Sequence, residues 1–275
     1  MEASPELTST RAPRVVAARR LASRSFRAEQ RLFLAEGPQA VREAASLTGV
    51  LAELFCTPEA AARYSEVVGA ARAGGARVSV ATSEVVASLS ETVTPQGLIG
   101  VCRFLDHPLD AVLAAGPPKL VALLAHVRDP GNAGTVLRCA DAAGADLVVV
   151  TGESVDVYNA KAVRASAGSL FHVPVVVGLS AEEAIESLRA AGLGILAADG
   201  TGEADLDDEL DSGALAAPTC WVFGNEARGL PDDLLALSDT VVRIPIHGRA
   251  ESLNLATAAA VCLYSSARAQ RRQAR

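Results

Sequence analysis

From residue 119 onward, short uninterrupted runs of Val, Leu and Ile alternate with stretches that are typical of helices. Strands that are buried on both faces have such continuous apolar runs, and they belong to parallel sheets covered by helices. The expected strands are 119–125, 147–151, 173–177, 194–198, 220–223 and 241–246; the expected helices are 134–143, 159–167, 181–191, 232–237 and 253–268. The pattern alone predicts an open, doubly wound α/β sheet, because knotted chains are nearly absent among known folds.

A smaller α/β unit is expected before this sheet. It has expected strands at 31–36, 51–57, 78–81 and 98–104, and expected helices at 14–28, 39–46, 60–73 and 83–89. Residues 106–118 contain three prolines and Gly116, which favours a linker. We therefore expect a disordered tail over 1–13, a first domain over 14–105, a linker over 106–118 and a second domain over 119–275.

The distribution of charge is uneven. A net charge of -7 argues against a protein that coats nucleic acid over its whole surface. The stretch 11–31 nevertheless carries one acidic residue, Glu29, against seven arginines: Arg11, Arg14, Arg19, Arg20, Arg24, Arg27 and Arg31. Contact with phosphate and a merely solvated helix face are both consistent with this pattern.

Other side chains limit the classes of function. The five cysteines are odd in number and form no CxxC pair, which favours small buried side chains in a reducing cytosol. The four histidines are scattered, so we expect no metal site. Neither a run of membrane-spanning length nor a signal-peptide core is present, which predicts a soluble, cytoplasmic protein.

Two of the expected strands end in glycine turns that are rich in hydrogen-bonding side chains. Asn225 and Glu226 follow Gly224 after the run 220–223, whereas Ser252 and Asn254 follow the run 241–246. Ligands of open α/β sheets bind at the carboxyl ends of strands. These two turns therefore predict a ligand site.

A third polar segment follows the first strand of the second domain. Asn132 is expected at the start of a helix, and Arg138 is expected nearly two turns further along it. Each has an ordinary explanation by itself, because Asn132 suits a helix N-cap and Arg138 suits a surface ion pair. The sequence GxGxxA at 192–197 follows a helix and begins a strand, which is the wrong context for dinucleotide binding.

Taken together, these segments resemble the three motifs of the SpoU (TrmH-like) branch of the SPOUT RNA methyltransferases. They are NxGxxxR at 132–138, GNExxGL at 224–230 and IPxxGxxESLN at 244–254. The resemblance covers about residues 119–268 and includes 163–174. Residues 31–38 resemble the start of that family's amino-terminal RNA-binding domain, which is related to ribosomal protein L30e. The family commonly continues its third motif as SLNVS, whereas this chain has Leu255 and Ala256 after Asn254.

The resemblance implies a trefoil knot over about 224–268 in place of an open sheet, and a homodimer. It also implies transfer of a methyl group from S-adenosylmethionine to a ribose 2'-hydroxyl, which we expect in 23S ribosomal RNA. By resemblance, the cofactor would be bound by Gly224, Asn225, Ile244 and Leu253. The catalytic residues would be Asn132, Arg138, Glu226, Ser252 and Asn254.

Elementary chemistry modifies one of these roles. An arginine side chain is effectively always protonated, so we expect Arg138 to stabilise negative charge rather than to act as a base. Three other functions were considered. A tRNA 2'-O-methyltransferase and a non-catalytic, ribosome-associated RNA-binding protein remain alternatives. An oxidoreductase of the dinucleotide-binding type is disfavoured, because no GxGxxG follows the first strand of the second domain.

Overall fold

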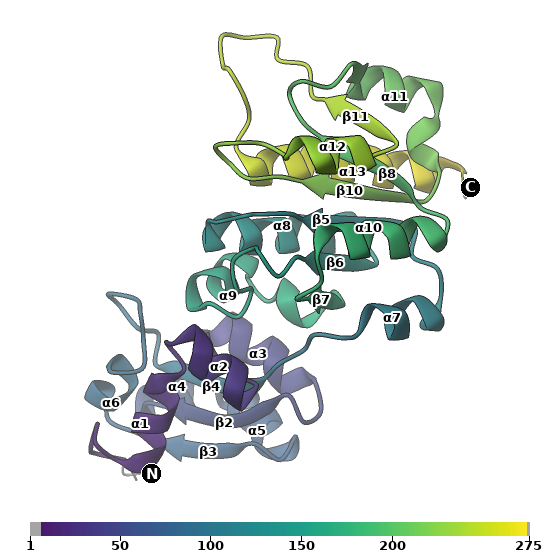
Figure 1. The fold of residues 1–275 in the computed structure, drawn as a ribbon. Coiled ribbons are helices and arrows are strands. Elements are labelled where there is room, and N and C mark those ends of the chain that lie inside the picture. The colour runs from purple at the N-terminus through teal and green to yellow at the C-terminus, as the bar shows by residue number, and fades with distance from the viewer. Residues whose placement is uncertain (1–6, 274–275) are drawn as a thin grey trace. The chain divides into compact units, whose positions relative to one another are not determined.

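The structure is a computed structural model that describes residues 7–273 (Figure 1). The described chain forms two compact units. The first contains the residues up to Leu105 together with Tyr158–Phe171, and the second contains Asp106–Val157 and the residues from His172 onward. No helix within residues 7–273 is long and apolar enough to cross a membrane.

The first unit is built on a four-stranded mixed sheet. Its strand order is β1 (Leu32–Glu36), β4 (Leu98–Arg103), β2 (Leu51–Cys56) and β3 (Arg77–Val80). Strand β4 is antiparallel to both neighbours, and β2 is parallel to β3. The helices expected around the sheet are α3 (Pro38–Ser46), α4 (Pro58–Arg63), α5 (Ser65–Ala73) and α6 (Ser83–Ala87).

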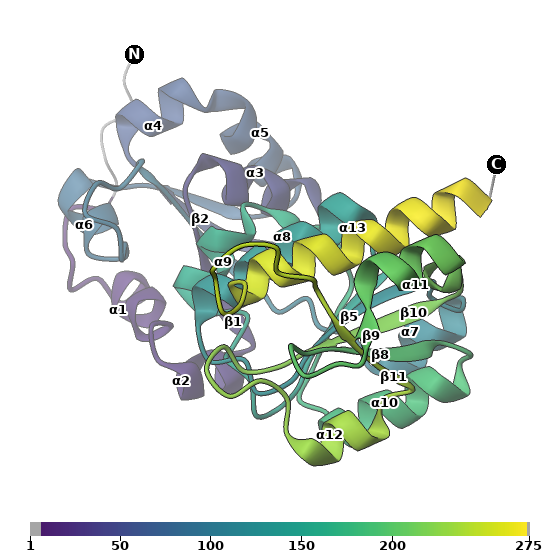
Figure 2. The ribbon, with the colours of Figure 1, turned by 90° about the horizontal axis from the view of Figure 1, so that it is seen from above.

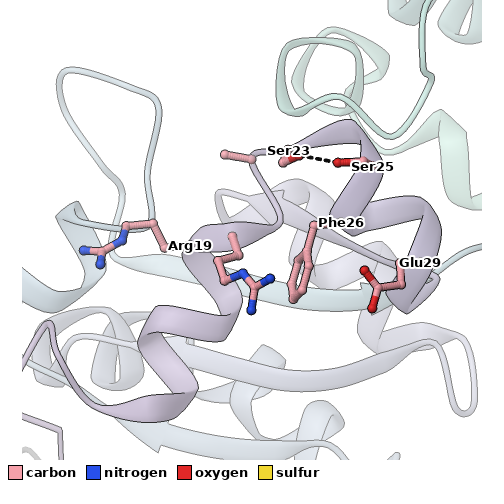
Figure 3. A pocket seen from close by; sticks show the side chains of 7 residues that line it. Arg19, Ser23, Ser25, Phe26 and Glu29 are labelled. Carbon is pink, nitrogen blue, oxygen red and sulfur yellow. Dashed lines mark hydrogen bonds between the residues drawn. The ribbon is translucent and has the colours of Figure 1, made fainter.

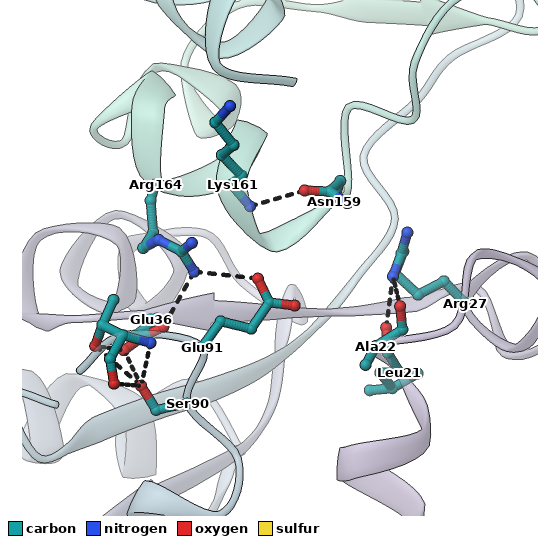
Figure 4. A network of polar contacts seen from close by, with 10 residues as sticks. Leu21, Ala22, Arg27, Glu36, Ser90, Glu91, Asn159, Lys161 and Arg164 are labelled. Carbon is teal, nitrogen blue, oxygen red and sulfur yellow. Dashed lines mark hydrogen bonds and ion pairs between the residues drawn. The ribbon is translucent and has the colours of Figure 1, made fainter. Parts of the chain in front are cut away.

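Two expected helices of this unit are broken. The prediction of one helix over 14–28 is wrong, because α1 (Pro13–Arg20) and α2 (Arg24–Gln30) are separate. Between them Ser23 is extended, and the Arg27 guanidinium donates to the carbonyl oxygens of Leu21 and Ala22 at 2.7 and 2.8 Å (Figure 4). The expected helix over 60–73 is likewise divided at Tyr64.

The stretch Tyr158–Phe171 packs within the first unit, although the sequence pattern assigns it to the second domain. It contains α9 (Ala160–Ser166) and a short 3-10 helix (Ser169–Phe171). The Tyr158 ring stacks on Phe104 with centroids 3.8 Å apart, and its hydroxyl accepts a hydrogen bond from the amide of Leu105 at 2.8 Å. Arg164 pairs with Glu36 and Glu91 at 3.3 and 3.6 Å (Figure 4). The first unit is therefore discontinuous in the sequence.

Two segments that were expected to be irregular carry structure. Of the expected disordered tail 1–13, residues 1–6 lie outside the described residues. The amide of Leu7 donates to the carbonyl of Val80 at 3.1 Å, and Leu7 forms a β-bridge with Ala81. Its apolar side chain is buried and completes the edge of the core. The expected linker 106–118 contains helix α7 (Leu109–Ala115), whose Leu109 is buried in the second unit.

The second unit is built on a seven-stranded sheet in which every pairing is parallel. This confirms the predicted parallel α/β sheet. The strand order is β7 (Val175–Val177), β6 (Leu147–Val150), β5 (Leu120–Leu124), β10 (Thr219–Phe223), β8 (Gly194–Ala198), β11 (Thr240–Arg243) and β9 (Ala204–Asp205). Strand β10 is central and buried throughout. The trefoil knot expected over 224–268 stays a prediction.

Helices cover both faces of this sheet (Figure 2). On one face, α7, α10 (Ala181–Ala190) and α12 (Asp232–Leu237) pack on side chains such as Val121 and Val222. On the other, α13 (Leu255–Gln273) packs on β5 and β10, alongside α8 (Pro130–Ala143). A buried hydrogen bond of 2.9 Å from the Trp221 indole to Ser266 fixes α13 on the sheet. Strand β9 and helix α11 (Leu206–Ser212) were not predicted.

Candidate active site

The polar segments singled out in the sequence follow the carboxyl ends of β5, β10 and β11. Two boundaries, the start of α8 and the end of β11, differ from expectation here. Helix α8 is capped by Asp129, whose side chain accepts from the amide of Gly131 at 3.2 Å, so Asn132 is not the N-cap. Strand β11 ends at Arg243, since Pro245 has no amide hydrogen for a strand ladder. Ile244 therefore lies in the loop that precedes α13.

The Glu226 carboxylate joins the loop after β10 to the start of α8. Its Oε1 accepts hydrogen bonds from the amide of Asp129 at 3.2 Å and from Asn132 Nδ2 at 3.0 Å, and its Oε2 accepts from the amide of Arg128 at 3.3 Å. Amides at a helix start have no partner within the helix and favour a negative charge. The Glu226 carboxylate therefore occupies the place at the start of α8 where these amides favour an anion.

These contacts control the ionisation of Glu226. Partial burial acts to raise the pKa of its carboxyl group. The hydrogen bonds from Asn132, from the backbone of Glu226 itself and from the amides of Asp129 and Arg128 outweigh that effect. The pKa of Glu226 therefore lies below its ordinary value of 4.5, and the group is a carboxylate at neutral pH.

Asn254 extends this network to the last helix. Its Nδ2 donates to Asn132 Oδ1 at 3.1 Å, while its Oδ1 accepts from the amides of Ala256 and Thr257 at 2.9 and 3.4 Å. Asn254 thereby caps α13, and Asn132 bridges it to Glu226. We call Glu226, Asn132 and Asn254 the carboxylate–amide chain. It ties three segments that are far apart in the sequence to one point.

Asn225 shapes the turn after β10. Its backbone exchanges two 2.9 Å hydrogen bonds with Gly229, and its Oδ1 accepts from the amides of Ala227 and Arg228 at 3.0 and 3.1 Å. Its Nδ2 donates to the carbonyl of His126 at 3.1 Å. The side chain therefore holds the turn in shape and joins it to the loop after β5.

Gly224 is required by packing within the chain. A Cβ atom at this position would lie 2.6 Å from both the carbonyl carbon and the oxygen of Gly229, and 2.7 Å from the nitrogen of Leu230. The family resemblance assigns Gly224 to cofactor binding. The structure gives a further reason, since the chain's own backbone approaches it from the other end of the turn.

A cavity of about 370 Å³ opens beside these loops. All four residues predicted to bind a cofactor line it, namely Gly224, Asn225, Ile244 and Leu253, and so do Glu226 and Ser252. Sequence analysis missed Asp199, which also lines the cavity and accepts hydrogen bonds from Thr201 and from the amide of Leu230. Its position directly after β8 is the signal that was available, because Gly224 takes the corresponding position after β10.

A second cavity of about 570 Å³ shares Asn225, Arg228 and Gly229 with the first. His126, Arg128 and Pro231 complete its lining. The His126 ring lies 3.1 Å from Glu153, whereas Arg128 and Arg228 bring two positive charges to the cavity. Side chains of this type bind phosphate groups.

Two predicted catalytic residues stand apart from the carboxylate–amide chain. Arg138 is exposed on α8, and Ser252 is exposed in the loop before α13. Within residues 7–273 no hydrogen bond or ion pair joins either side chain to Glu226, Asn132 or Asn254. The structure thus brings together three of the five predicted catalytic residues, and it leaves the Arg138 guanidinium available to a ligand.

Comparison with known proteins agrees with this architecture. Residues 119–264 match the SpoU rRNA Methylase family, and residues 12–100 match the MRM3-like substrate binding domain. The 23S rRNA (guanosine(2553)-2'-O)-methyltransferase RlmP of Bacillus subtilis is 30% identical over 90% of this chain and 92% of its own length.

Solved structures also resemble the whole chain. An AdoMet-bound rRNA methyltransferase from Sinorhizobium meliloti is 32% identical, with a TM-score of 0.83 over 95% of this chain and 97% of that one. The SpoU methyltransferase AviRb from Streptomyces viridochromogenes, in complex with the cofactor AdoMet, is 30% identical, with a TM-score of 0.82 over 96% of this chain and 100% of that one. With the family match spanning the cavity, the carboxylate–amide chain and Arg138, this chain belongs to the SpoU rRNA methylase family.

Proposed function

We propose that this protein transfers a methyl group from S-adenosylmethionine to a ribose 2'-hydroxyl of 23S ribosomal RNA. The observation that carries the proposal is the carboxylate–amide chain beside the 370 Å³ cavity, where all three motif segments meet. The choice of 23S RNA is supported by the relative in Bacillus subtilis, whose name specifies that RNA.

The cavity suits S-adenosylmethionine. Its volume falls within the range of small-molecule sites, roughly 300–1,000 Å³. Ile244, Leu253 and Leu255 offer an apolar surface for a flat purine, and the carboxylates of Asp199 and Glu251 suit a positively charged ligand. Backbone around Gly224 and Ile244 would hold the cofactor, as the family resemblance implies. When bound, S-adenosylmethionine supplies an electrophilic methyl group.

The chain's own residues then divide the remaining tasks. Glu226 is occupied by amide donors, so its role is to fix the loops that form the site. Arg138 holds the substrate phosphate and stabilises the negative charge that develops on the ribose oxygen as the hydroxyl proton passes to water. Ser252 orients the hydroxyl or the guanidinium, whereas Asn254, whose amide group is bonded to Asn132 and to the start of α13, holds the third motif segment in place.

The second cavity is our candidate for the target nucleotide. It adjoins the first through Asn225 and Arg228, so a sugar bound there lies next to the cofactor cavity. Arg128 and Arg228 supply charge for the flanking phosphates, whose contacts position RNA without reading its sequence. Arg128 lines the second cavity but not the first, so the predicted effect of Arg128→Gln is weaker RNA binding with unchanged cofactor affinity.

We further propose that the protein is a knotted, cytoplasmic homodimer. Helix α13 exposes one stripe at helical spacing, and within it Val261 and Tyr264 are 37% and 51% exposed. Large apolar side chains on a helix face are typical of protein interfaces. Sedimentation velocity tests this, since Val261→Glu with Tyr264→Glu is expected to convert a dimer to a monomer. A wild-type protein that sediments as a monomer at micromolar concentration would remove the proposal.

The decisive experiment incubates the protein with labelled S-adenosylmethionine and total RNA, separates 23S, 16S and transfer RNA, and maps the 2'-O-methyl group. Label at one ribose of 23S RNA is the expected result. Label in transfer RNA would support the proposed reaction but contradict 23S RNA as the substrate. Absence of both label and cofactor binding by calorimetry would refute the enzyme and favour the non-catalytic RNA-binding alternative.

A further inference from the structure

The arginines between residues 11 and 31 have different tasks in the first unit. Arg14 donates to Glu53 at 2.8 Å and to Ser79 at 2.9 Å, and Arg27 is 4% exposed and bonded to two backbone carbonyls. These two hold the fold. Arg19, Arg20 and Arg24 are exposed, and within residues 7–273 none of them forms an ion pair with an acidic side chain.

Arg27 fixes the corner between α1 and α2. Its guanidinium, in the last turn of α2, donates to the carbonyls of Leu21 and Ala22 just after α1, so a buried charge-assisted contact sets the angle between the two helices (Figure 4). The corner encloses a groove of about 350 Å³. Side chains of both helices and of their connection line it: Arg19, Arg20, Ser23, Ser25, Phe26 and Glu29 (Figure 3).

The groove combines three kinds of group. The Arg20 guanidinium lies over the Phe26 ring, 4.0 Å from its centroid, which gives a flat cationic and aromatic surface. The hydroxyls of Ser23 and Ser25 are exposed and lie 2.9 Å apart. Arg19 adds a second positive charge, and Glu29 supplies the one carboxylate of the lining.

We propose that this groove, defined here as the α1–α2 groove, binds one unpaired nucleotide of the RNA substrate, with its base on the Arg20–Phe26 surface and its phosphate at Arg19. Proteins bind single-stranded RNA by stacking its bases on aromatic rings and guanidinium planes. They position phosphates with arginines and hydroxyls. The groove combines an aromatic ring, arginines and hydroxyls at the fixed corner between α1 and α2. Its volume suits a nucleotide rather than a duplex. An acidic protein would use the charges but would have no need of the stacking surface.

The proposal rests on the proposed function, since the nucleotide in the groove belongs to the RNA that the protein is proposed to methylate. Point variants are needed to test it, because the basic segment also carries part of the core. Val15, Ala18 and Leu21 are buried in the core of the first unit, so such a deletion would remove core and groove together.

The test compares two double variants of the full chain. Arg19→Gln/Arg20→Gln removes the groove charges. Arg63→Gln/Arg72→Gln removes two exposed arginines elsewhere on the same unit, where Arg63 also lies over an aromatic ring, that of Tyr64. Both variants lower the net charge by two, so the control measures any effect of charge alone.

Binding of a 23S RNA fragment is measured over a range of salt concentrations. Each phosphate contact on single-stranded RNA contributes about 0.7 to the slope of log affinity against log salt. The groove variant is expected to lose about 0.7 of that slope, because Arg19 is the residue placed at the phosphate, and the control variant is expected to keep the wild-type slope. Equal changes in the two variants, or none in the groove variant, would overturn the proposal and leave the groove to an acidic protein partner.

Phe26→Leu tests the base contact separately, because it retains an apolar side chain and removes the ring. Loss of one stacked base is expected to weaken RNA binding about tenfold with little change in salt slope. Cofactor affinity, measured by calorimetry, should match the wild type. If the wild-type protein methylates RNA but neither groove variant alters RNA binding, the groove proposal fails while the proposed function stands.

Discussion

Replacement of Glu226 by glutamine tests whether its carboxylate holds the active-site loops together. Glutamine has one acceptor oxygen, and its nitrogen would face a donor whichever way the amide is turned. If the nitrogen takes the place of Oε2, the amide of Arg128 loses its partner; if it takes the place of Oε1, Asp129 and Asn132 both do. At least one hydrogen bond is lost, and the remainder lose their charge assistance.

The expected cost follows from those contacts. Hydrogen bonds to charged groups contribute about 1.5–3 kcal/mol and neutral ones about 0.5–1.5 kcal/mol. Because Glu226 is largely exposed, we take the lower end. The variant should therefore lower the free energy of unfolding of the second unit by about 1–2 kcal/mol at pH 7.

The dependence on pH gives a sharper signature. The folded-state pKa of Glu226 lies below 4.5, so its contribution to stability is present above about pH 4.5 and is lost as pH falls through the folded-state value. The difference between the wild type and Glu226→Gln should therefore narrow below pH 4.5. As pH falls, the contacts of other carboxylates weaken equally in both proteins. The difference between their free energies of unfolding therefore reports Glu226 alone.

Urea unfolding followed by tryptophan fluorescence measures this quantity. Trp221 is the sole tryptophan and is buried in β10, so its emission reports the second unit alone. Glu186→Gln, which makes the same change of charge at an exposed site on α10, is the matched control. A difference within about 0.5 kcal/mol, the range of ordinary surface substitutions, or one that is constant with pH, would refute the reasoning.

Three further outcomes are expected. Arg138→Ala should abolish methyl transfer with cofactor affinity by calorimetry nearly unchanged; loss of cofactor binding would contradict an electrostatic role. Gly224→Ala should destabilise the second unit by about 1–3 kcal/mol and weaken cofactor binding, because its Cβ would lie 2.6 Å from the backbone of Gly229. Ser266→Ala leaves the Trp221 indole without its partner, so urea unfolding should show a loss of about 1–3 kcal/mol, and an unchanged midpoint would argue against that bond.

The sequence was most informative about local order. Continuous apolar runs predicted the parallel strands of the second unit, and the polar residues that follow them predicted the segments around the cavity. Both inferences depend on neighbouring residues in the chain. The roles assigned to Arg138 and to the other candidate residues stay predictions, since hydrogen bonds describe a site but do not report a reaction.

Features that depend on distant partners were not predictable. Glu226 and Asn132 are 94 residues apart, and no spacing rule relates them. The division of the expected helix 14–28 depends on Arg27 turning back onto two carbonyls, whereas its composition suggested one more exposed cation. The packing of Tyr158–Phe171 in the first unit depends on the fit of Tyr158 against Phe104, which a strand–helix alternation does not encode.

The central place of β10 also has a consequence for how the chain acquires its fold. Strand β10 pairs with β5 on one side and β8 on the other, through Trp221 opposite Ala122 and Leu196. A nascent chain that ends before residue 219 therefore has two long apolar strand edges with no strand between them, and such edges invite aggregation. Pairing across about a hundred residues is slow to form. Both cavities are completed only by residues after β10, so the protein becomes able to bind ligands only after the segments that follow β10 have been synthesised.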